Sequence, residues 1–261
     1  WLLLFSYVYY VSGGIKATCF LIFTTVTTWY AGILLESLTQ NESDRNKRKR
    51  RKKGVLVTTL LLTFGVLGVL KYTIFALATF HMVLGTGHRE VSLLLPLGIS
   101  FYTFQSMGYL LDVYWERTRA EHHFLRFALF VSFFPQILQG PIGRFERLAR
   151  QLYESHSFDL KRAQLSLLRI LWGYFKKMVI ADNAVIFVDA IFQEPEAYSG
   201  ICIVGVLAYS IQLYCDFSGG MDVVIGIAGL FGIELDENFK RPYFAVSITD
   251  FWHRWHITLG T

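Results

Sequence analysis

The sequence contains few cysteines and lacks several short motifs that identify common enzyme classes. Cys19, Cys202 and Cys215 do not have the spacing of a metal site, and we expect all three to be buried free thiols. There is no phosphate-binding glycine loop, no Gly-x-Ser-x-Gly turn and no Cys-x-x-Cys pair. No internal repeat of the transporter kind is visible. These absences argue against nucleotide-driven pumps, serine hydrolases, redox enzymes and transporters built from repeats.

Long apolar runs dominate the 261 residues instead. The composition is 53% hydrophobic and 16% aromatic, with a mean hydropathy of +0.40. Soluble proteins are less apolar, and Trp and Tyr favour the membrane interface. Because about 20 apolar residues cross the hydrocarbon core, we expect crossing helices. These predicted helices cover residues 17–38, 54–80, 91–111 and 201–214, with the end of another at 1–11.

Three further segments do not fit a simple crossing. Residues 124–138 are too short for one, so we expect a half-crossing or re-entrant element. Residues 144–161 carry both charge signs and are typical of an amphipathic surface segment. Residues 164–192 contain several charges, so they lie either at the interface or along a protein cavity. The predicted fold class is all-α: a polytopic transmembrane helical bundle with re-entrant or interfacial helices, in one domain over residues 1–261.

A basic run indicates how the chain is oriented. Lys and Arg fill most positions from 45 to 53, within a predicted polar loop at 41–53. A short basic loop between two crossings marks the cytoplasmic side, and anionic lipid headgroups would attract the same charges. This run supplies much of the net charge of +5 and has no interleaved aromatic residues. We therefore expect membrane lipid as a partner, and no nucleic acid.

The last fifty residues gather Asp, His, Asn, Arg and Trp in an otherwise apolar chain, and such residues usually face a cavity or a partner. His253 and His256 are three apart, so on a helix over 251–256 they would share a face. Thr249 and Asp250 are the predicted cap of that helix. Two readings stay open: a metal pair with Asp250 as third ligand, or a histidine that acts as base or positioning group for a hydroxyl.

Asp216 and Asp222 are six residues apart across a Gly-Gly pair, which is not the spacing of an acid–base pair. We expect them to hydrogen-bond Arg241, Arg254 or helix ends. Glycines recur from Gly219 onward at spacings that let helices pack closely in lipid.

The loop at 235–243 is polar. Asn238 and Tyr243 are predicted to pin it to the rest of the chain.

Several of these stretches form a recognisable series. In chain order they are Pro96-Leu-Gly-Ile-Ser-Phe-Tyr-Thr-Phe-Gln105, Phe134-Pro-Gln-Ile-Leu-Gln-Gly-Pro-Ile142, Gly173-Tyr-Phe-Lys-Lys-Met-Val-Ile-Ala-Asp-Asn183, Cys215-Asp-Phe-Ser-Gly-Gly-Met-Asp222, Leu230-Phe-Gly-Ile233, Glu237-Asn-Phe-Lys-Arg-Pro-Tyr243 and Asp250-Phe-Trp-His-Arg-Trp-His-Ile-Thr-Leu259. The series resembles the membrane-bound O-acyltransferase family, in particular its bacterial branch of alginate O-acetylation and teichoic-acid D-alanylation proteins. The resemblance covers most of the chain.

The resemblance implies an O-acyltransferase of the bacterial cytoplasmic (inner) membrane. It would move an acyl group, expected to be acetyl, from a cytoplasmic donor toward a cell-surface polysaccharide. No bound cofactor is expected, since acetyl-CoA or an acyl carrier protein would be a substrate. The expected partner is an extracytoplasmic acyl-accepting protein or polysaccharide. Two alternatives stay open: D-alanyl transfer from a carrier protein to teichoic acid and, outside this class, a transporter or an inactive structural relative.

The resemblance also implies which residues act. His256 matches a second active-site histidine, whereas the family's principal histidine lies beyond Thr261, and we expect the chain to be truncated at both ends. His253 stands where the family usually has Arg, so it is expected to be structural. No metal is expected. The predicted supporting residues are Asp216, Asp222, Asn238 and Arg254.

Overall fold

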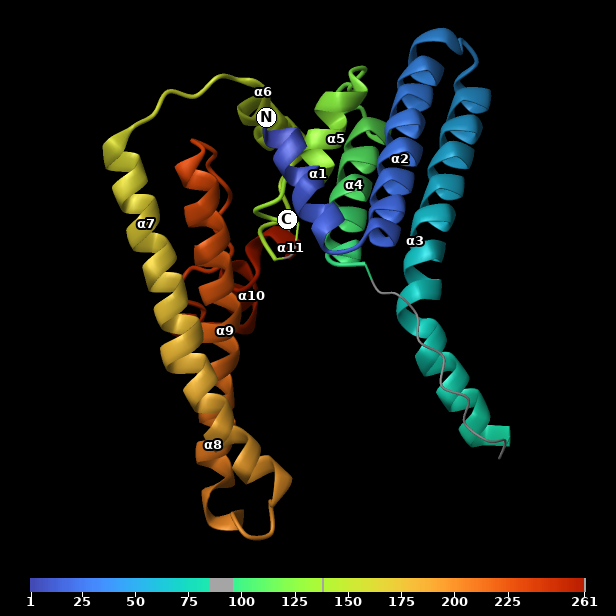
Figure 1. Cartoon of the computed structure of the whole chain (residues 1–261). Helices are drawn as coiled ribbons and strands as arrows, with labels where there is room; N and C mark the ends of the chain where they lie inside the picture. The colour runs from blue at the N-terminus through green and yellow to red at the C-terminus, as the bar shows by residue number, and fades with distance from the viewer. Residues whose placement is uncertain (85–95, 138, 261) are drawn as a thin grey trace. The chain divides into compact units, whose positions relative to one another are not determined.

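The computed structural model describes residues 1–84, 96–137 and 139–260 (Figure 1). Within these ranges every regular element is a helix, and the β-type pairing is a single isolated bridge between Phe239 and Trp255. The prediction of an all-α protein is therefore confirmed.

The chain divides into two compact units. The first comprises Trp1–Leu138 and Arg144–Tyr153, and the second comprises Gln139–Gly143 and Glu154–Thr261. Each unit is described by itself below. A single membrane-embedded domain over the whole chain stays a prediction.

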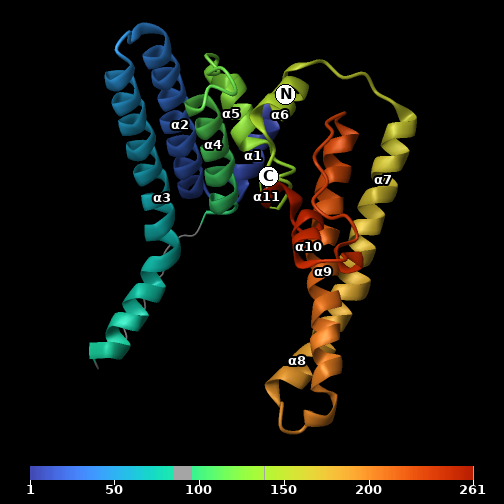
Figure 2. The ribbon, with the colours of Figure 1, turned by 180° about the vertical axis from the view of Figure 1, so that it is seen from behind.

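The first unit is a helical bundle. Its helices are α1 (Leu2–Ser12), α2 (Ile15–Asn41), α3 (Arg45–Leu84), α4 (Ile99–Tyr114), α5 (Phe124–Ser132) and α6 (Phe145–Tyr153). Helix α2 lies between α3 and α4 (Figures 1 and 2). The core is aromatic: the ring of Tyr109 lies 4.7 Å from those of Phe127 and Phe145, centroid to centroid. Helix α6 buries one face, as the predicted amphipathic segment requires.

Helix α4 begins at Ile99, inside the predicted crossing at 91–111. Gly98 precedes it with a φ of 68°, and a Cβ at this position would collide with the carbonyl oxygen of Ile137. Only glycine satisfies both conditions. Residues 91–95 of the predicted crossing, and His88 before them, lie outside the described residues.

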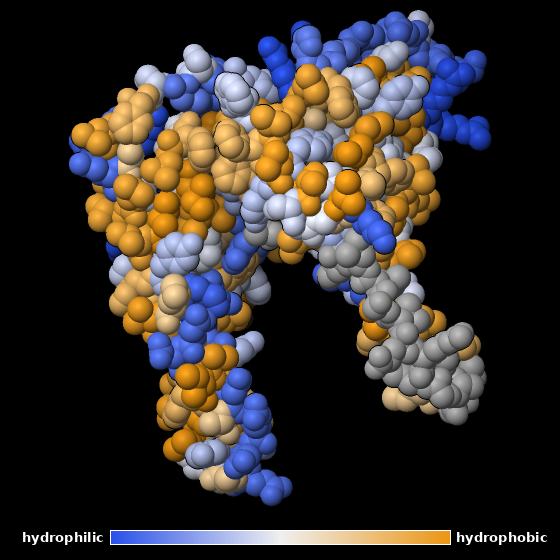
Figure 3. Space-filling model, viewed as in Figure 1, coloured by the Kyte–Doolittle hydropathy of each residue, from blue (hydrophilic) through white to orange (hydrophobic). Residues whose placement is uncertain are grey.

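The basic run is not a loop, which corrects the prediction for residues 41–53. Helix α2 ends at Asn41 and α3 already begins at Arg45, so the run forms the first turns of α3. The carboxylate of Asp44 accepts hydrogen bonds from the backbone N–H groups of Asn46 and Lys47 and so caps the helix. Lys and Arg are good helix formers, and their charge does not prevent a capped start. Figure 3 shows hydrophilic residues gathered where α2 meets α3.

Three helices of the described chain are long and apolar enough to cross a membrane. They are Ile15–Asn41, Arg45–Phe80 and Cys202–Leu230. The predicted crossing at 201–214 is therefore longer than expected. Cys215 is buried, but Cys19 is exposed and Cys202 is half-buried, so the prediction of three buried thiols is wrong for two of them. Both lie on helices of membrane length, where an outward face can meet lipid instead of protein.

The second unit is built around a long helical hairpin. Its elements are α7 (Leu160–Tyr174), the π-helical segment η1 (Phe175–Ala181), α8 (Asp182–Gln193), the short turn η2 (Ser199–Ile201), α9 (Cys202–Leu230), the turn η3 (Pro242–Phe244), α10 (Ile248–Arg254) and α11 (Ile257–Gly260). Helix α7 runs alongside α9 (Figures 1 and 2). The half-crossing predicted at 124–138 belongs to the first unit, where α5 covers Phe124–Ser132, and its re-entrant path stays a prediction.

Glycines set the distance between α7 and α9. A Cβ on Gly173 would lie 2.6 Å from the carbonyl oxygen of Gly219, and a Cβ on Gly219 would lie 2.8 Å from that of Gly173. Both values are too short for a real contact, so only glycine fits at either position. The predicted close packing of small residues is confirmed here.

Candidate active site around His256

Helix α10 ends two residues before His256, which corrects the prediction of one helix over 251–256. The helix is capped by Ser247, whose hydroxyl accepts the N–H of Asp250 at 3.1 Å, and not by Thr249 and Asp250. It ends at Arg254, and His256 follows with a φ of 47°, in the left-handed region. His253 and His256 therefore do not share a helix face. The side chain of His253 is exposed, and its structural role stays a prediction.

Asp250 and Arg254 bind each other within α10. The Nε of Arg254 donates to Oδ1 of Asp250 at 2.8 Å, while Oδ2 accepts the N–H of Val246 at 3.1 Å. The hydrogen bond from Arg254 is the main reason why the pKa of Asp250 lies below its usual value. Both side chains are thus engaged locally. Within the described residues no group of three His, Cys, Asp or Glu side chains could hold a metal ion.

The imidazole of His256 packs against α9. Its ring centroid lies 4.9 Å from that of Phe217. Its Nδ1 is buried and has no hydrogen-bond partner among the described residues. Burial lowers the pKa of His256 below its ordinary value and so favours the neutral form of the ring. A neutral imidazole has one ring nitrogen that can accept a proton, and here Nδ1 is left without a protein donor.

Asn238 holds the segment that follows His256. Its Oδ1 accepts the N–H and the hydroxyl of Thr258, at 2.9 and 2.7 Å, and its backbone carbonyl accepts the N–H of Ile257 at 3.0 Å. The side chain of Asn238 is only 1% exposed, and its Nδ2 faces the sulfur of Met221 on α9. The prediction that Asn238 pins the loop is confirmed.

An aromatic cluster backs the same loop. Trp255 stacks on Phe251 with ring centroids 5.6 Å apart, and lies edge-on to Phe239 at 5.1 Å. Tyr214 on α9 packs against both Phe239 and Tyr243. The hydroxyl of Tyr243 donates to the carbonyl of Ser210 on α9 at 2.6 Å, which confirms its predicted pinning role. The loop at 235–243 is therefore attached to α9 through Phe239 and Tyr243, both of which precede His256 in the chain.

The two aspartates of α9 face α7 and η1, which corrects their predicted partners. Asp222 accepts Arg169 Nε at 3.0 Å and Lys176 Nζ at 2.5 Å, and Asp216 accepts Lys177 Nζ at 2.7 Å. Neither binds Arg241 or Arg254. The reason is that the Gly-Gly pair does not interrupt α9, so both carboxylates point toward the charges of the neighbouring helix.

Sequence reasoning missed the partners on α7, although it noted the charges in residues 164–192. Arg169 also donates through Nη1 and Nη2 to the two carboxylate oxygens of Glu237, at 2.6 Å each. Lys176 is 7% exposed and donates as well to the hydroxyl of Ser218 at 2.9 Å. Arg169 and Lys176 thus face protein, whereas Asp182 and Asp189 of the same segment are exposed. The only sign of these ion pairs in the sequence was the number of charged residues in an otherwise apolar segment.

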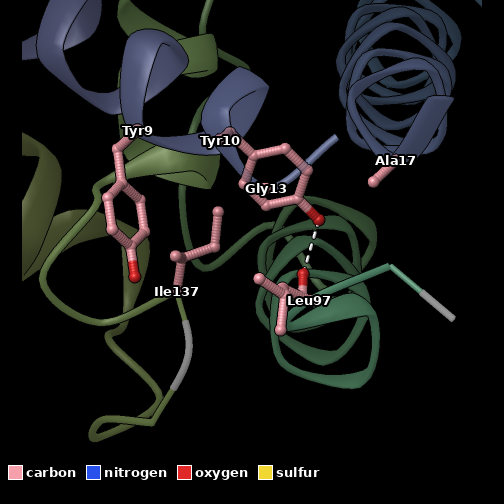
Figure 4. A pocket seen from close by; sticks show the side chains of 6 residues that line it. All are labelled: Tyr9, Tyr10, Gly13, Ala17, Leu97 and Ile137. Atoms are coloured by element: carbon pink, nitrogen blue, oxygen red, sulfur yellow. Dashed lines mark hydrogen bonds between the residues drawn. The ribbon is translucent and has the colours of Figure 1, made fainter. Parts of the chain in front are cut away.

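The first unit contains a small apolar pocket (Figure 4). It is lined by Tyr9, Tyr10, Gly13, Ala17, Leu97 and Ile137. The hydroxyl of Tyr10 donates to the carbonyl of Leu97 at 2.5 Å. The pocket has a volume of about 10 Å³ and admits one water molecule at most, so it is not a substrate site.

The sequence is similar to a known protein family and to several known proteins. The model of the membrane-bound O-acyltransferase family matches residues 117–261. A probable alginate O-acetylase of Pseudomonas aeruginosa is 35% identical over 100% of the chain and 49% of its own length. A peptidoglycan O-acetyltransferase of Helicobacter pylori is 35% identical over 100% of the chain and 53% of its own length. A teichoic acid D-alanyltransferase of Bacillus subtilis is 29% identical over 66% of the chain and 45% of its own length. The chain spans about half the length of the curated relatives it matches.

Proposed function

The chain belongs to the membrane-bound O-acyltransferase family, and on this premise we propose that it is part of an enzyme that transfers an acetyl group to a hydroxyl of a cell-surface polysaccharide. Two of the relatives above are named as O-acetyl-transferring enzymes, for alginate and for peptidoglycan, and both match the whole chain. This supports acetyl as the acyl group and a polysaccharide as the acceptor.

The observation that carries the proposal is the state of His256. It follows Trp255 in the Trp-His motif of the family resemblance, its Nδ1 is buried without a protein partner, and burial keeps its pKa low. Acyl transfer needs a group that accepts the proton of the attacking hydroxyl or orients that hydroxyl. A neutral imidazole meets this need, because one of its two ring nitrogens accepts a proton. His256 is thus proposed as an active-site residue.

The reaction uses a thioester donor. The hydroxyl oxygen attacks the acyl carbonyl carbon, a C–O bond forms and the C–S bond breaks. The hydroxyl proton goes to a base, and the leaving thiolate is protonated to a thiol. Dipoles that stabilise the oxyanion complete the requirement, and neither a metal nor a bound cofactor is needed. Acetyl-CoA or an acyl carrier protein is the proposed donor, as a substrate.

The membrane-length helices support a membrane setting. We place the protein in the bacterial inner membrane as a multi-pass protein, with the basic start of α3 on the cytoplasmic side. The donor would then be bound from the cytoplasm. The acceptor, a polysaccharide or an acyl-accepting protein, would be bound on the other side.

D-alanyl transfer to teichoic acid is the second candidate. The relative named for that activity is less similar and matches only 66% of the chain, so the acetyl proposal is favoured. A carrier protein charged with D-alanine distinguishes the two, since only the second candidate would use it. A transporter or an inactive relative would transfer neither group.

The test is acyl transfer by the full-length protein in membranes, with labelled acetyl-CoA or acetylated carrier protein and a polysaccharide acceptor. Replacing His256 by Ala is expected to lower the rate roughly 100-fold or more. His253→Gln is the matched control, because His253 is exposed and lies one turn earlier; its rate should stay near that of the wild type. Unchanged transfer by His256→Ala would remove His256 from the mechanism.

A further inference from the structure

Arg169 joins three separate parts of the second unit. It lies on α7, and its Nε and Nη2 lie 3.0 and 2.9 Å from Oδ1 of Asp222 on α9. Nη1 and Nη2 also form a two-pronged contact with the carboxylate of Glu237, at 2.6 Å each. Such a planar, bidentate contact fixes the direction as well as the distance of the partner. Arg169 therefore holds the residue next to Asn238 in one orientation.

Asp222 is held on both oxygens, which makes it a fixed anchor for Arg169. Its Oδ2 accepts Lys176 Nζ at 2.5 Å, and Lys176 in turn donates to Ser218. Lys176 lies in the π-helical segment η1, a kind of distortion that is frequent at functional sites. The side chains of Lys176 and Asp222 are only 9% and 15% exposed, so water weakens this pair little.

The contacts of Glu237 continue to His256. Glu237 directly precedes Asn238 in the chain. Asn238 accepts hydrogen bonds from the N–H groups of Ile257 and Thr258 and from the hydroxyl of Thr258. These bonds fix the backbone directly after His256, whose own φ of 47° is strained for a residue with a Cβ. A strained conformation persists only where its surroundings hold it, so the segment from Glu237 to Thr258 is the support of the His256 conformation.

We propose that Arg169 is a positioning residue for His256, acting through Glu237 and Asn238. This rests on the proposed function, in which His256 takes part in acyl transfer. The guanidinium touches no reacting group; it fixes the loop that presents the imidazole against Phe217. Because a misplacement of about 1 Å at a reacting group can cost about 100-fold in rate, such support can limit the chemical step without contacting substrate.

A neighbouring ion pair supplies the matched control. Lys177 lies in η1, directly after α7, and binds Asp216 on α9 at 2.7 Å, so it also ties α9 to the preceding arm of the hairpin. Its contacts do not reach the loop from Glu237 to Thr258, and its side chain is 44% exposed. If the charges served only to hold the hairpin together, removing either Arg169 or Lys177 would affect the protein in the same way.

The experiment measures acyl transfer by the full-length protein in membranes, with labelled acetyl-CoA or acetylated carrier protein as donor. Arg169→Lys keeps the charge but loses the two-pronged contact. We expect its kcat to fall at least 10-fold while the KM for the donor changes less than threefold. We also expect the acid limb of its pH profile to move up toward pH 6.5, because the imidazole becomes more hydrated. Lys177→Gln is expected to keep its rate within twofold and its pH profile unchanged.

A double variant tests the path itself. If Arg169 acts through Asn238, then Arg169→Lys combined with Asn238→Ala should be no slower than Asn238→Ala alone. Where Arg169→Lys does not accumulate in membranes, Glu237→Gln replaces it, since that side chain is 48% exposed and its substitution keeps the size.

Two outcomes would overturn the proposal. One is an Arg169→Lys rate equal to that of the wild type or of Lys177→Gln. The other is losses that multiply in the double variant, with an unchanged pH profile, which would show a purely structural role. His256→Ala is measured in parallel: if it transfers at the wild-type rate, the proposed function itself fails, whatever Arg169→Lys does.

Discussion

The Oδ1 atom of Asn238 accepts two hydrogen bonds from Thr258, one from its backbone N–H at 2.9 Å and one from its hydroxyl at 2.7 Å. The hydroxyl of Thr258 also accepts the N–H of Ile142 at 3.0 Å. One buried amide thereby joins the loop after α9, the segment after His256 and the stretch at residues 139–143. All three belong to the second unit, and His256 lies two residues before their meeting point.

Replacing Asn238 by Ala should therefore weaken both stability and transfer. Two donors of Thr258 lose their acceptor in a buried place, which lowers the free energy of unfolding by about 1–3 kcal/mol. The acyl-transfer rate in membranes should fall at least 10-fold, since the backbone around His256 loses its support. Thr258→Ser keeps both donors and serves as the control, with a rate near that of the wild type. Equal rates for Asn238→Ala and Thr258→Ser would show that these bonds do not matter for transfer.

The pH dependence of transfer should report the burial of His256. Its pKa is lowered from 6.5 by burial, so the acid limb of kcat/KM should have its midpoint below pH 6.5. The free energy of unfolding should change in the same pH range. Below pH 6.5 the unfolded chain binds the proton more readily than the folded chain, so the protein loses stability as the pH is lowered, until the pH passes the lower pKa of the folded state. The measurement is transfer in membranes across pH, with expression and integrity checked at each point.

Phe217→Ala sharpens this test. The ring of Phe217 covers the imidazole, and its removal lets water reach His256. The midpoint of the acid limb should then rise toward 6.5. An unchanged midpoint would mean that another group titrates in this range.

The sequence predicted the membrane-length helices, because they depend on local composition. Apolar runs of sufficient length identified α2, the apolar part of α3 and the N-terminal part of α9. These features need no knowledge of distant contacts. The sequence did not predict that α3 begins at Arg45. A run of like charges suggests a loop, whereas the carboxylate of Asp44 caps this run as the start of a helix.

The ion pairs could not be predicted, because their partners are far apart in the chain. Arg169 is 53 residues from Asp222 and 68 from Glu237, and only the packing of α7 on α9 brings them together. The turn at His256 was missed for a related reason. Its neighbours suit a helix, but the carbonyl and side chain of Asn238 bind the N–H groups of Ile257 and Thr258, and a continuing α10 would need those same groups.

Gly173→Ala should disturb the α7–α9 hairpin. The added methyl group would lie 2.6 Å from the Gly219 carbonyl oxygen, so the two helices must separate or the side chain must distort. Overpacking of this kind costs about 1–3 kcal/mol. Gly65→Ala is the matched control, since nothing lies within 4 Å of the new methyl group in α3 and alanine favours a helix. Thermal inactivation of the two variants in membranes should show a loss for Gly173→Ala only; equal inactivation would contradict the close packing.

The orientation of the α2–α3 turn can be measured through Ser43, which is exposed between the two helices. Cys19, Cys202, Cys215 and every further cysteine of the full-length protein are first replaced by Ser, so that Ser43→Cys carries the only thiol. A charged thiol reagent that cannot cross the inner membrane should leave this cysteine unlabelled in intact cells and label it after the membrane is opened, because the basic start of α3 favours the cytoplasmic side. Replacing Lys47, Arg50 and Lys53 by Gln removes much of that charge and should increase the fraction labelled in intact cells. Labelling of Ser43→Cys in intact cells at the same rate as in opened membranes would place the turn outside, and the donor would then have to approach from the opposite end of α2 and α3.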